Sequence, residues 1–143
     1  MDCISANPVT ANEFATGSHD RTIKIWDLNK PDQSIKTLSG NKEGIWCINY
    51  HKNGKELISA SPEGIAKIWD IKAGKSTAEL KYHTKRVFWA TYNNAGTHAA
   101  TCGSDRILAY WDLRKTATPL HTNTRKLYLS YNIFRERYSD IVL

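Results

Sequence analysis

The sequence has no long hydrophobic run and few sulfur-containing residues. None of its apolar segments approaches the ~18 residues that a membrane-spanning helix requires, and its first residues lack the pattern of a secretory signal. Only three cysteines occur among the 143 residues, and no two form a Cys-x-x-Cys pair. These absences argue against a disulfide framework and a zinc knuckle, and they favour an intracellular chain, cytoplasmic or nuclear.

The sequence also lacks the short motifs of common enzyme classes. It contains neither a Gly-x-Ser-x-Gly nucleophile motif nor a glycine-rich phosphate loop. We therefore expect no enzymatic activity, no cofactor and no metal ion. The net charge of +6 is diffuse, without any block of five or six like charges, and this pattern is typical of a solvated surface. A nucleic-acid partner is accordingly not favoured.

What the sequence does contain is an internal repeat. Three similar segments each contain a Trp-Asp pair, and their tryptophans are 43 and 42 residues apart. The segments are TGSHDRTIKIWDLNK (16–30), SASPEGIAKIWDIKA (59–73) and TCGSDRILAYWDLRK (101–115). The agreement continues upstream of the second and third segments, so the repeating unit is about 42 residues long.

Each unit reads as a set of short strands. The apolar segments, such as Ile23 to Trp26 and Ile45 to Tyr50, are short and often alternate with polar residues, and turn formers such as Asn53-Gly54 and Ala73-Gly74 separate them. About four strands fit in one unit. A sheet of this size cannot bury both of its faces, so it must pack against its neighbours.

The period and the Trp-Asp signature resemble the WD-repeat β-propeller family, whose repeat of ~40–45 residues forms a four-stranded blade. The resemblance implies an all-β fold of antiparallel four-stranded blades, an incomplete propeller of about three. It covers residues 1–121, with blades at about 1–38, 39–80 and 81–121. Residues 122–143 are a non-repetitive tail or the start of a fourth blade. Such a chain is either a fragment or a partial propeller completed by another chain or by self-association.

The resemblance assigns four polar residues of the third repeat to a hydrogen-bonded tetrad. His83, Thr101, Asp105 and Trp111 fill the family's positions for this buried chain. An imidazole, a hydroxyl and a carboxylate together also resemble a hydrolase triad. The structural reading is favoured, because in the family the tetrad pins a turn to the start of the inner strand.

The other two repeats depart from this tetrad. In the second, Asn41, Ser59, Glu63 and Trp69 occupy the four positions, so an amide replaces the histidine and we expect a weaker or rewired network. In the first, Thr16, Asp20 and Trp26 are present, and the histidine position falls before Met1.

The resemblance further implies a non-enzymatic scaffold that binds other proteins, as a subunit of a multiprotein complex. Partners of propellers of this family sit on the face with the turn between the second and third strands. The candidate residues on that face are His19, Arg21, Lys42, Lys85, Arg86, Ser104 and Arg106. Arg21, Lys85, Arg86 and Arg106 would favour an acidic or phosphorylated peptide.

Two tryptophans lie on the predicted inner strands outside the Trp-Asp signature. Trp46 and Trp89 occupy neighbouring columns of the repeat, so we expect them to face opposite sides of their sheets. Packing between blades is the predicted role of both.

Two alternative functions come from other features. The segment Trp111 to Arg114 resembles the box through which substrate receptors dock to a cullin-type ubiquitin ligase, and this makes Arg114 a partner-binding candidate.

Aromatic and basic residues alternate in the tail, a composition that RNA binding requires. They are Tyr128, Tyr131, Phe134 and Tyr138, with Arg125, Lys126, Arg135 and Arg137.

Overall fold

The computed structural model describes residues 3–124, and in these each repeat folds into one four-stranded antiparallel sheet. The first sheet consists of β1 (Cys3–Ala6), β2 (Glu13–Gly17), β3 (Ile23–Asp27) and β4 (Lys36–Leu38). The second consists of β5 (Cys47–Tyr50), β6 (Glu56–Ala60), β7 (Ile65–Asp70) and β8 (Lys75–Lys81). The third consists of β9 (Val87–Tyr92), β10 (His98–Gly103), β11 (Leu108–Asp112) and β12 (His121–Asn123).

The strands of each sheet follow one another in sequence order, joined by hairpin turns. The turns at Gly54 and Gly96 use backbone φ angles of 67° and 71°, in the left-handed region where a glycine avoids the steric cost of a side chain. The prediction of incomplete propeller blades, each of four antiparallel strands, is confirmed. β12 continues to Asn123, so the third sheet extends two residues beyond the expected boundary at 121.

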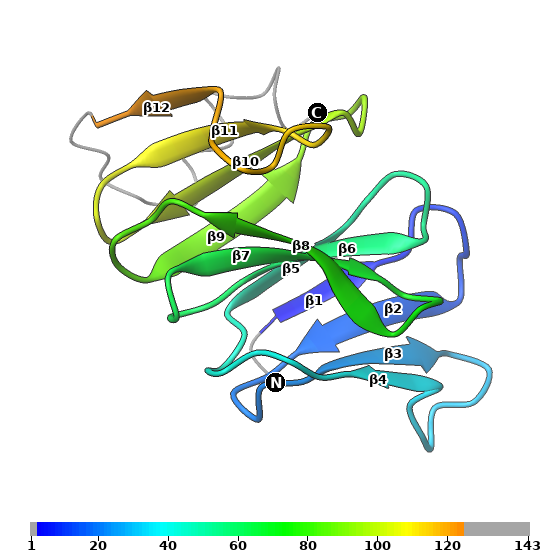
Figure 1. Cartoon of the computed structure of the whole chain (residues 1–143). Helices are drawn as coiled ribbons and strands as arrows, with labels where there is room; N and C mark the ends of the chain where they lie inside the picture. Colours follow the sequence, from blue (N-terminus) through cyan, green and yellow to red (C-terminus); the bar gives the residue numbers. More distant parts are fainter. Residues whose placement is uncertain (1–2, 125–143) are drawn as a thin grey trace.

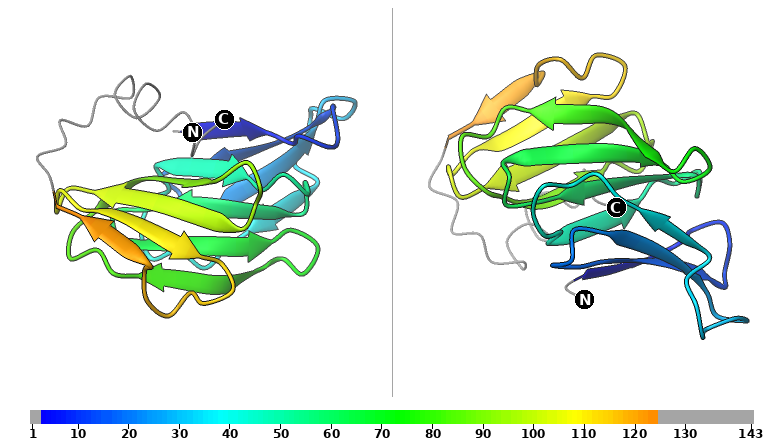
Figure 2. Two further views of the ribbon diagram at one scale, coloured as in Figure 1. Left: turned by 90° about the horizontal axis from the view of Figure 1, so that it is seen from above. Right: turned by 60° about the horizontal axis from the view of Figure 1, so that its bottom comes forward.

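The three sheets lie side by side, with their first strands adjacent. β1 packs next to β5, and β5 next to β9, as inner strands around a common axis do (Figure 1). The two further views in Figure 2 show the same order of sheets, with the first and third on opposite sides of the second. We call the contact between the first and second sheets the first boundary, and that between the second and third the second boundary.

The apolar core is divided between the two boundaries. One cluster of buried residues includes Ile25, Ile45 and Trp69 at the first boundary, and another includes Cys47, Ala90 and Trp111 at the second. Each sheet therefore depends on its neighbour to bury its faces, as the repeat pattern predicts.

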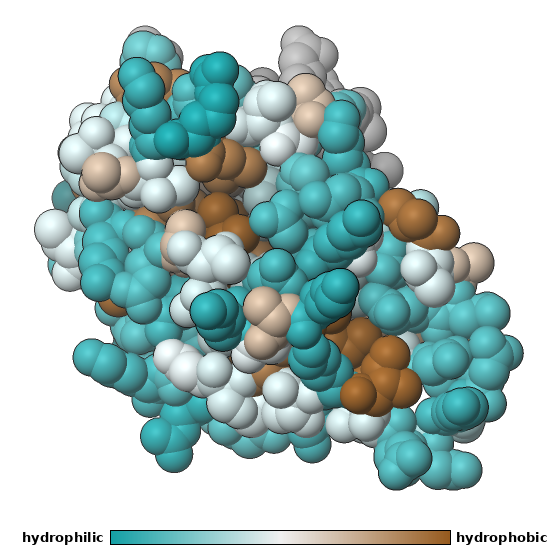
Figure 3. Space-filling view, turned by 45° about the vertical axis from the view of Figure 1, so that its right-hand side comes forward, coloured by the Kyte–Doolittle hydropathy of each residue, from teal (hydrophilic) through white to brown (hydrophobic). Residues whose placement is uncertain are grey.

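The outer surface is mostly hydrophilic on the side shown in Figure 3, where apolar side chains form small separate patches. Among residues 3–124, the exposed large apolar residues are Ile4, Val9, Leu28, Ile35, Tyr82, Phe88 and Leu120. The residues that the structure describes form no helix of the length and apolarity that a membrane span needs. The expected start of a fourth blade lies outside the described residues.

Candidate functional site

The four tetrad residues of the third repeat form one continuous chain of hydrogen bonds. His83 comes from the loop before β9, Thr101 from β10, Asp105 from the β10–β11 turn and Trp111 from β11. The Trp111 indole N–H donates to Thr101 Oγ1 over 2.9 Å, and Thr101 Oγ1 lies 2.8 Å from His83 Nε2. His83 Nδ1 lies 2.9 Å from a carboxylate oxygen of Asp105.

The chemistry of these groups fixes the direction of the bonds. The Asp105 carboxylate only accepts, so His83 Nδ1 carries the proton, and Nε2 is left to accept the hydrogen of Thr101. Asp105 also accepts from the backbone N–H of Thr84 at 3.1 Å, which ties the loop before β9 to the β10–β11 turn. Thr101 is only 1% exposed, so its hydroxyl is sealed from solvent, and the set holds the loop and the turn together.

The second repeat uses a different set of contacts at the same place. Ser59 still accepts from the Trp69 indole at 2.9 Å, but both polar side-chain atoms of Asn41 are buried without a hydrogen-bond partner. The amine of Lys67, a residue only 3% exposed, reaches Gly40 O at 2.7 Å and Glu63 Oε1 at 3.3 Å. A buried lysine on β7 thus joins the loop before β5 to the β6–β7 turn. Lys67 is outside the family's tetrad positions, so the repeat alignment did not single it out.

In the first repeat only half of the network is formed. The Trp26 indole donates to Thr16 Oγ1 at 2.9 Å. Asp20 turns toward its own hairpin, where it accepts from the hydroxyl and the backbone N–H of Thr22. These two bonds lower the pKa of Asp20 below its usual value, the hydroxyl bond contributing most.

The turns that carry the tetrad carboxylates lie on one edge of the three sheets. The backbone N–H of Ile45 donates to Ser18 O at 3.0 Å, and that of Val87 donates to Ser61 O at 3.2 Å. The loop that leads into the first strand of the second sheet, and likewise that of the third, is thus bonded to the turn of the preceding sheet; we call these two loops the lead-in loops. We call this edge, formed by residues 18–22, 39–46, 61–64, 82–86 and 104–107, the turn edge. It brings together seven of the partner-binding candidates: His19, Arg21, Lys42, Lys85, Arg86, Ser104 and Arg106.

Two of the three arginines of the turn edge have an unusual backbone conformation, and all three are exposed. Arg21 and Arg106 have φ angles of 73° and 66°, a left-handed conformation that costs non-glycine residues free energy. Arg21, Arg86 and Arg106 are all exposed, and so is Lys85. Ser104 is half-buried, and its backbone N–H donates to Arg86 O at 2.8 Å, which fixes the third turn against the lead-in loop.

An aromatic stack lies beside Arg86. The rings of Trp46 and Phe88 are stacked across the second boundary, with centroids 5.6 Å apart, and the Arg86 guanidinium lies 5.8 Å from the centre of the Trp46 ring. Phe88 remains 39% exposed, whereas Trp89, the next residue of β9, is half-buried. Trp46 therefore packs between sheets and also reaches solvent, at the point where an exposed cation lies over it.

Arg114 lies apart from the other candidates. It follows β11, at the opposite edge from the β10–β11 turn, because Asp112 at the end of β11 pairs with His98 at the start of β10. Its guanidinium donates twice to the Asp112 carboxylate, at 2.9 and 2.6 Å, although the Arg114 side chain is 79% exposed. The bonds from Arg114 hold the pKa of Asp112 well below its usual value.

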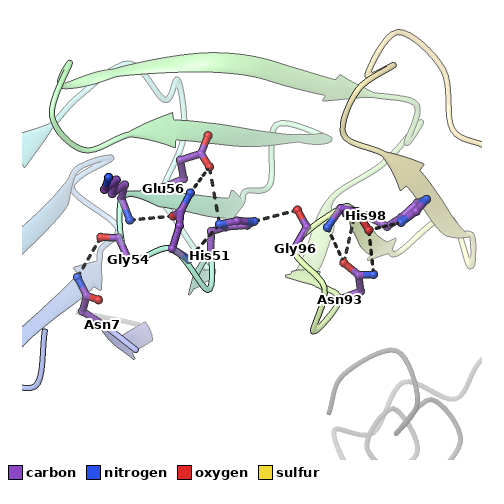
Figure 4. A network of polar contacts seen from close by, with 10 residues as sticks. Asn7, His51, Gly54, Glu56, Asn93, Gly96 and His98 are labelled. Carbon is purple, nitrogen blue, oxygen red and sulfur yellow. Dashed lines mark hydrogen bonds and ion pairs between the residues drawn. The ribbon is translucent and has the colours of Figure 1, made fainter. Parts of the chain in front are cut away.

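A second set of polar contacts crosses the boundaries at this opposite edge, and sequence reasoning missed it. The Asn7 carboxamide N–H donates to Gly54 O at 3.0 Å, and His51 Nε2 donates to Gly96 O at 2.9 Å, one repeat further (Figure 4). In both cases a polar side chain after an inner strand reaches the glycine of the next sheet's hairpin turn. The recurrence of Asn-Gly or Ala-Gly in these turns is the only signal in the sequence that points to them.

Comparison with known proteins supports the same architecture. The chain matches the family described as "WD domain, G-beta repeat" over residues 3–27, 32–70 and 74–112. It is 38% identical to coatomer subunit beta'-2 of Arabidopsis thaliana over 86 residues, which cover 59% of this chain and 9% of that protein.

Two further relatives cover more of the chain. E3 ubiquitin-protein ligase COP1 of Arabidopsis thaliana is 30% identical over 72% of this chain and 15% of its own length. WD repeat-containing protein 70 of Xenopus tropicalis is 28% identical over 80% of this chain and 20% of its own length. The chain thus spans a fifth or less of these relatives. The family is generally one of non-catalytic scaffolds that bind other proteins, and the matched repeats, the three blades and the tryptophan-centred networks establish that this chain belongs to the WD-repeat family.

Proposed function

We propose that this chain is a non-enzymatic protein-interaction scaffold and that it binds its partner on the turn edge. The observation that carries the proposal is the exposed Arg86 over the stacked rings of Trp46 and Phe88. Exposed aromatic and arginine side chains are the residue types that supply most of the binding energy in protein interfaces. Hydrogen bonds of His83, Asp105 and Ser104 hold the loop and the turn that carry this surface.

The charge of this surface favours an acidic or phosphorylated peptide as the binding partner. Arg86, Lys85 and Arg106 belong to the same loop-and-turn unit, in which Ser104 is bonded to the backbone of Arg86. Guanidinium groups bind carboxylate and phosphate oxygens through paired hydrogen bonds. The Trp46–Phe88 stack offers an apolar surface beside them for the uncharged part of the peptide.

The named relatives support a role within a larger assembly. One is a coatomer subunit and another is an E3 ubiquitin-protein ligase. By analogy, this chain serves in a multiprotein complex. Its location in the cytoplasm or nucleus stays a prediction.

Peptide arrays test the turn edge directly. One set of sequences is presented in phosphorylated, glutamate-substituted and neutral forms, and binding is measured by fluorescence anisotropy. We expect the chain to bind the charged forms, and Arg86→Glu to abolish this binding. Lys52→Glu makes the same change of charge on the opposite edge, and it should change the affinity by no more than about twofold. Equal loss in both variants, or equal binding of neutral peptides, would contradict the proposal.

A second candidate function is that of a substrate receptor of a cullin-type ubiquitin ligase. The observation in its favour is the fixed, exposed position of Arg114, which Asp112 holds by two hydrogen bonds. Arg114→Ala should then abolish binding to the ligase adaptor while the turn-edge peptides still bind. If adaptor binding is absent in the unaltered chain, this candidate fails.

RNA association is the least favoured alternative, and its aromatic and basic residues lie outside the described residues. Phosphate contacts weaken steeply as salt rises, so an affinity that does not change between low and physiological salt would exclude it.

A further inference from the structure

The loop between β11 and β12 carries a Thr-Pro dipeptide, Thr118-Pro119. This loop, residues 113–120, joins the two outermost strands of the third sheet (Figure 1). Residues 71–74 suffice for the corresponding connection of the second sheet, so the loop of the third sheet is longer. It begins at the opposite edge and is therefore separate from the surface proposed to bind the partner.

The acceptor hydroxyl in this dipeptide is open to an enzyme. Thr118 is exposed, and within residues 3–124 its hydroxyl makes no hydrogen bond. In the same part of the chain no backbone hydrogen bond holds residues 116–119, and the nearest ones are donated by Lys115 on one side and Leu120 on the other. An active site can therefore draw this segment in without breaking a backbone bond of the sheet.

The proline also prepares the conformation that a protein kinase needs. Its ring disfavours the helical region for the preceding residue, so the backbone of Thr118 is biased toward an extended conformation. Protein kinases hold the residues around the acceptor hydroxyl in an extended conformation, and proline-directed kinases require a proline directly after it. Thr118-Pro119 meets both requirements.

A second dipeptide of this kind in the chain shows what makes a hydroxyl inaccessible. Ser61-Pro62 lies in the β6–β7 turn, and Ser61 is only 1% exposed. Its hydroxyl oxygen accepts from the Glu63 N–H at 3.2 Å, and its carbonyl oxygen accepts from the Val87 N–H at 3.2 Å. The fold thus presents the hydroxyl of Thr118 and buries that of Ser61.

We propose that Thr118 is phosphorylated by a proline-directed protein kinase. The kinase transfers the γ-phosphoryl group of ATP to Thr118 Oγ1: the new P–O bond forms as the bond to the ADP oxygen breaks, and the hydroxyl proton passes to the catalytic aspartate of the kinase.

Phosphorylation would change the charge of the whole loop. Its charged residues are Arg114 and Lys115, and both are exposed. A phosphate group carries close to two negative charges at neutral pH, so it takes the loop from cationic to about neutral. The modification is therefore a charge switch beside the pair that Arg114 forms with Asp112.

The folded 143-residue chain, a cyclin-dependent kinase and ATP provide the test. Mass spectrometry measures the rate of phosphate incorporation at each site. Peptides of residues 112–124 and 55–67 are the references, because they present the two dipeptides without the fold. Thr118 in the folded chain should react within about threefold of the rate of its own peptide, whereas Ser61 should react at least about tenfold more slowly than its peptide.

Three variants complete the experiment. Thr118→Ala should remove the phosphate, and Pro119→Ala should slow its incorporation at Thr118 at least about tenfold, because a proline-directed kinase reads that ring. Thr116→Ala is the matched control, since it removes a threonine of the same loop that no proline follows, and it should leave the rate unchanged. The proposal is overturned if the 112–124 peptide does not react, if the peptide reacts and the folded chain does not, or if Pro119→Ala reacts at the original rate.

Discussion

The second and third blades join the same loop to the same turn with different chemistry. In the third, a histidine links Asp105 to Thr101 and Trp111, and each of these four tetrad side chains has a hydrogen-bond partner. In the second, a buried lysine donates to Gly40 O and forms an ion pair with Glu63, while Glu63 Oε1 and the amide of Asn41 are left without a hydrogen bond. The comparison teaches that two different sets of residues can join this loop to this turn.

The two cross-links also differ in how much desolvation they must overcome. The third blade buries an imidazole beside one carboxylate, whereas the second buries a lysine amine between Glu63 and Glu79, the latter 36% exposed. A buried ion pair loses much of its attraction to the desolvation cost, so the lysine contributes less net stability than its three contacts suggest.

The largest expected effect comes from removing the histidine. His83→Leu leaves the nearly buried Asp105 carboxylate without its main partner, and we expect it to lower the free energy of unfolding by about 3 to 5 kcal/mol, measured by chemical denaturation. Asn41→Leu, at the same position of the second blade, should change it by less than about 1 kcal/mol, because the amide it replaces makes no bond. Equal destabilisation by the two substitutions would show that the comparison is wrong.

A smaller effect is expected from the lysine of the second blade. Lys67→Met isolates the buried Glu63 carboxylate and should cost about 2 kcal/mol in the free energy of unfolding. Lys67→Met combined with Glu63→Leu should restore most of this loss, because no buried charge then remains unpaired. A double variant as unstable as the single one would mean that Lys67 acts through packing alone.

The tyrosines of the two boundaries should respond differently to loss of their hydroxyls. Tyr50→Phe breaks the bond from its hydroxyl to Glu13 Oε1 and should cost about 1 kcal/mol, while Tyr92→Phe removes a buried hydroxyl that has no hydrogen-bond partner and should cost nothing or stabilise slightly. Denaturation midpoints of the two variants measure the difference.

His51→Asn sharpens this test, because it supplies the second N–H that Asn7 has. Asn7 Nδ2 donates one hydrogen to a backbone oxygen and the other to Glu13, whereas His51 Nε2 has a single hydrogen, which a backbone oxygen takes. In that background Glu56, which matches Glu13 in the repeat, should move to Tyr92, and Tyr92→Phe should then become as costly as Tyr50→Phe. If Tyr92→Phe still leaves the free energy of unfolding unchanged in this background, the number of N–H groups on residue 51 does not control the position of Glu56.

The smallest expected effect concerns the Trp-Asp carboxylates. The pKa of Asp112 is lowered in the folded chain by Arg114, so its contribution to stability is present above the ordinary aspartate pKa of about 3.9 and is lost as pH falls toward the folded value. Arg114→Ala should therefore reduce the loss of stability below about pH 4, measured by denaturation at several pH values. Lys72→Ala, at the matching position of the second repeat, is the control and should leave the acid dependence unchanged.

The repeat made most of the fold predictable. Three copies of Trp-Asp in register indicate the number of sheets, and alternating apolar residues indicate strands, because a side-chain period of two suits only a sheet. The turn-edge candidates follow from the position of the hairpins within each repeat. Lys67 was not predictable in this way, because a lysine at a strand position normally reads as solvent-facing.

By itself, the sequence determined the blade architecture, because local patterning and a recurring signature act at every copy. Only the tertiary structure decided which polar atoms are satisfied, since this depends on distances between side chains far apart in the chain. Asn7 and His51 occupy one column of the repeat and make the same bond to a glycine, yet one holds a glutamate against a tyrosine and the other does not. The physical reason is a single hydrogen on a nitrogen, whose effect appears only once two blades pack together.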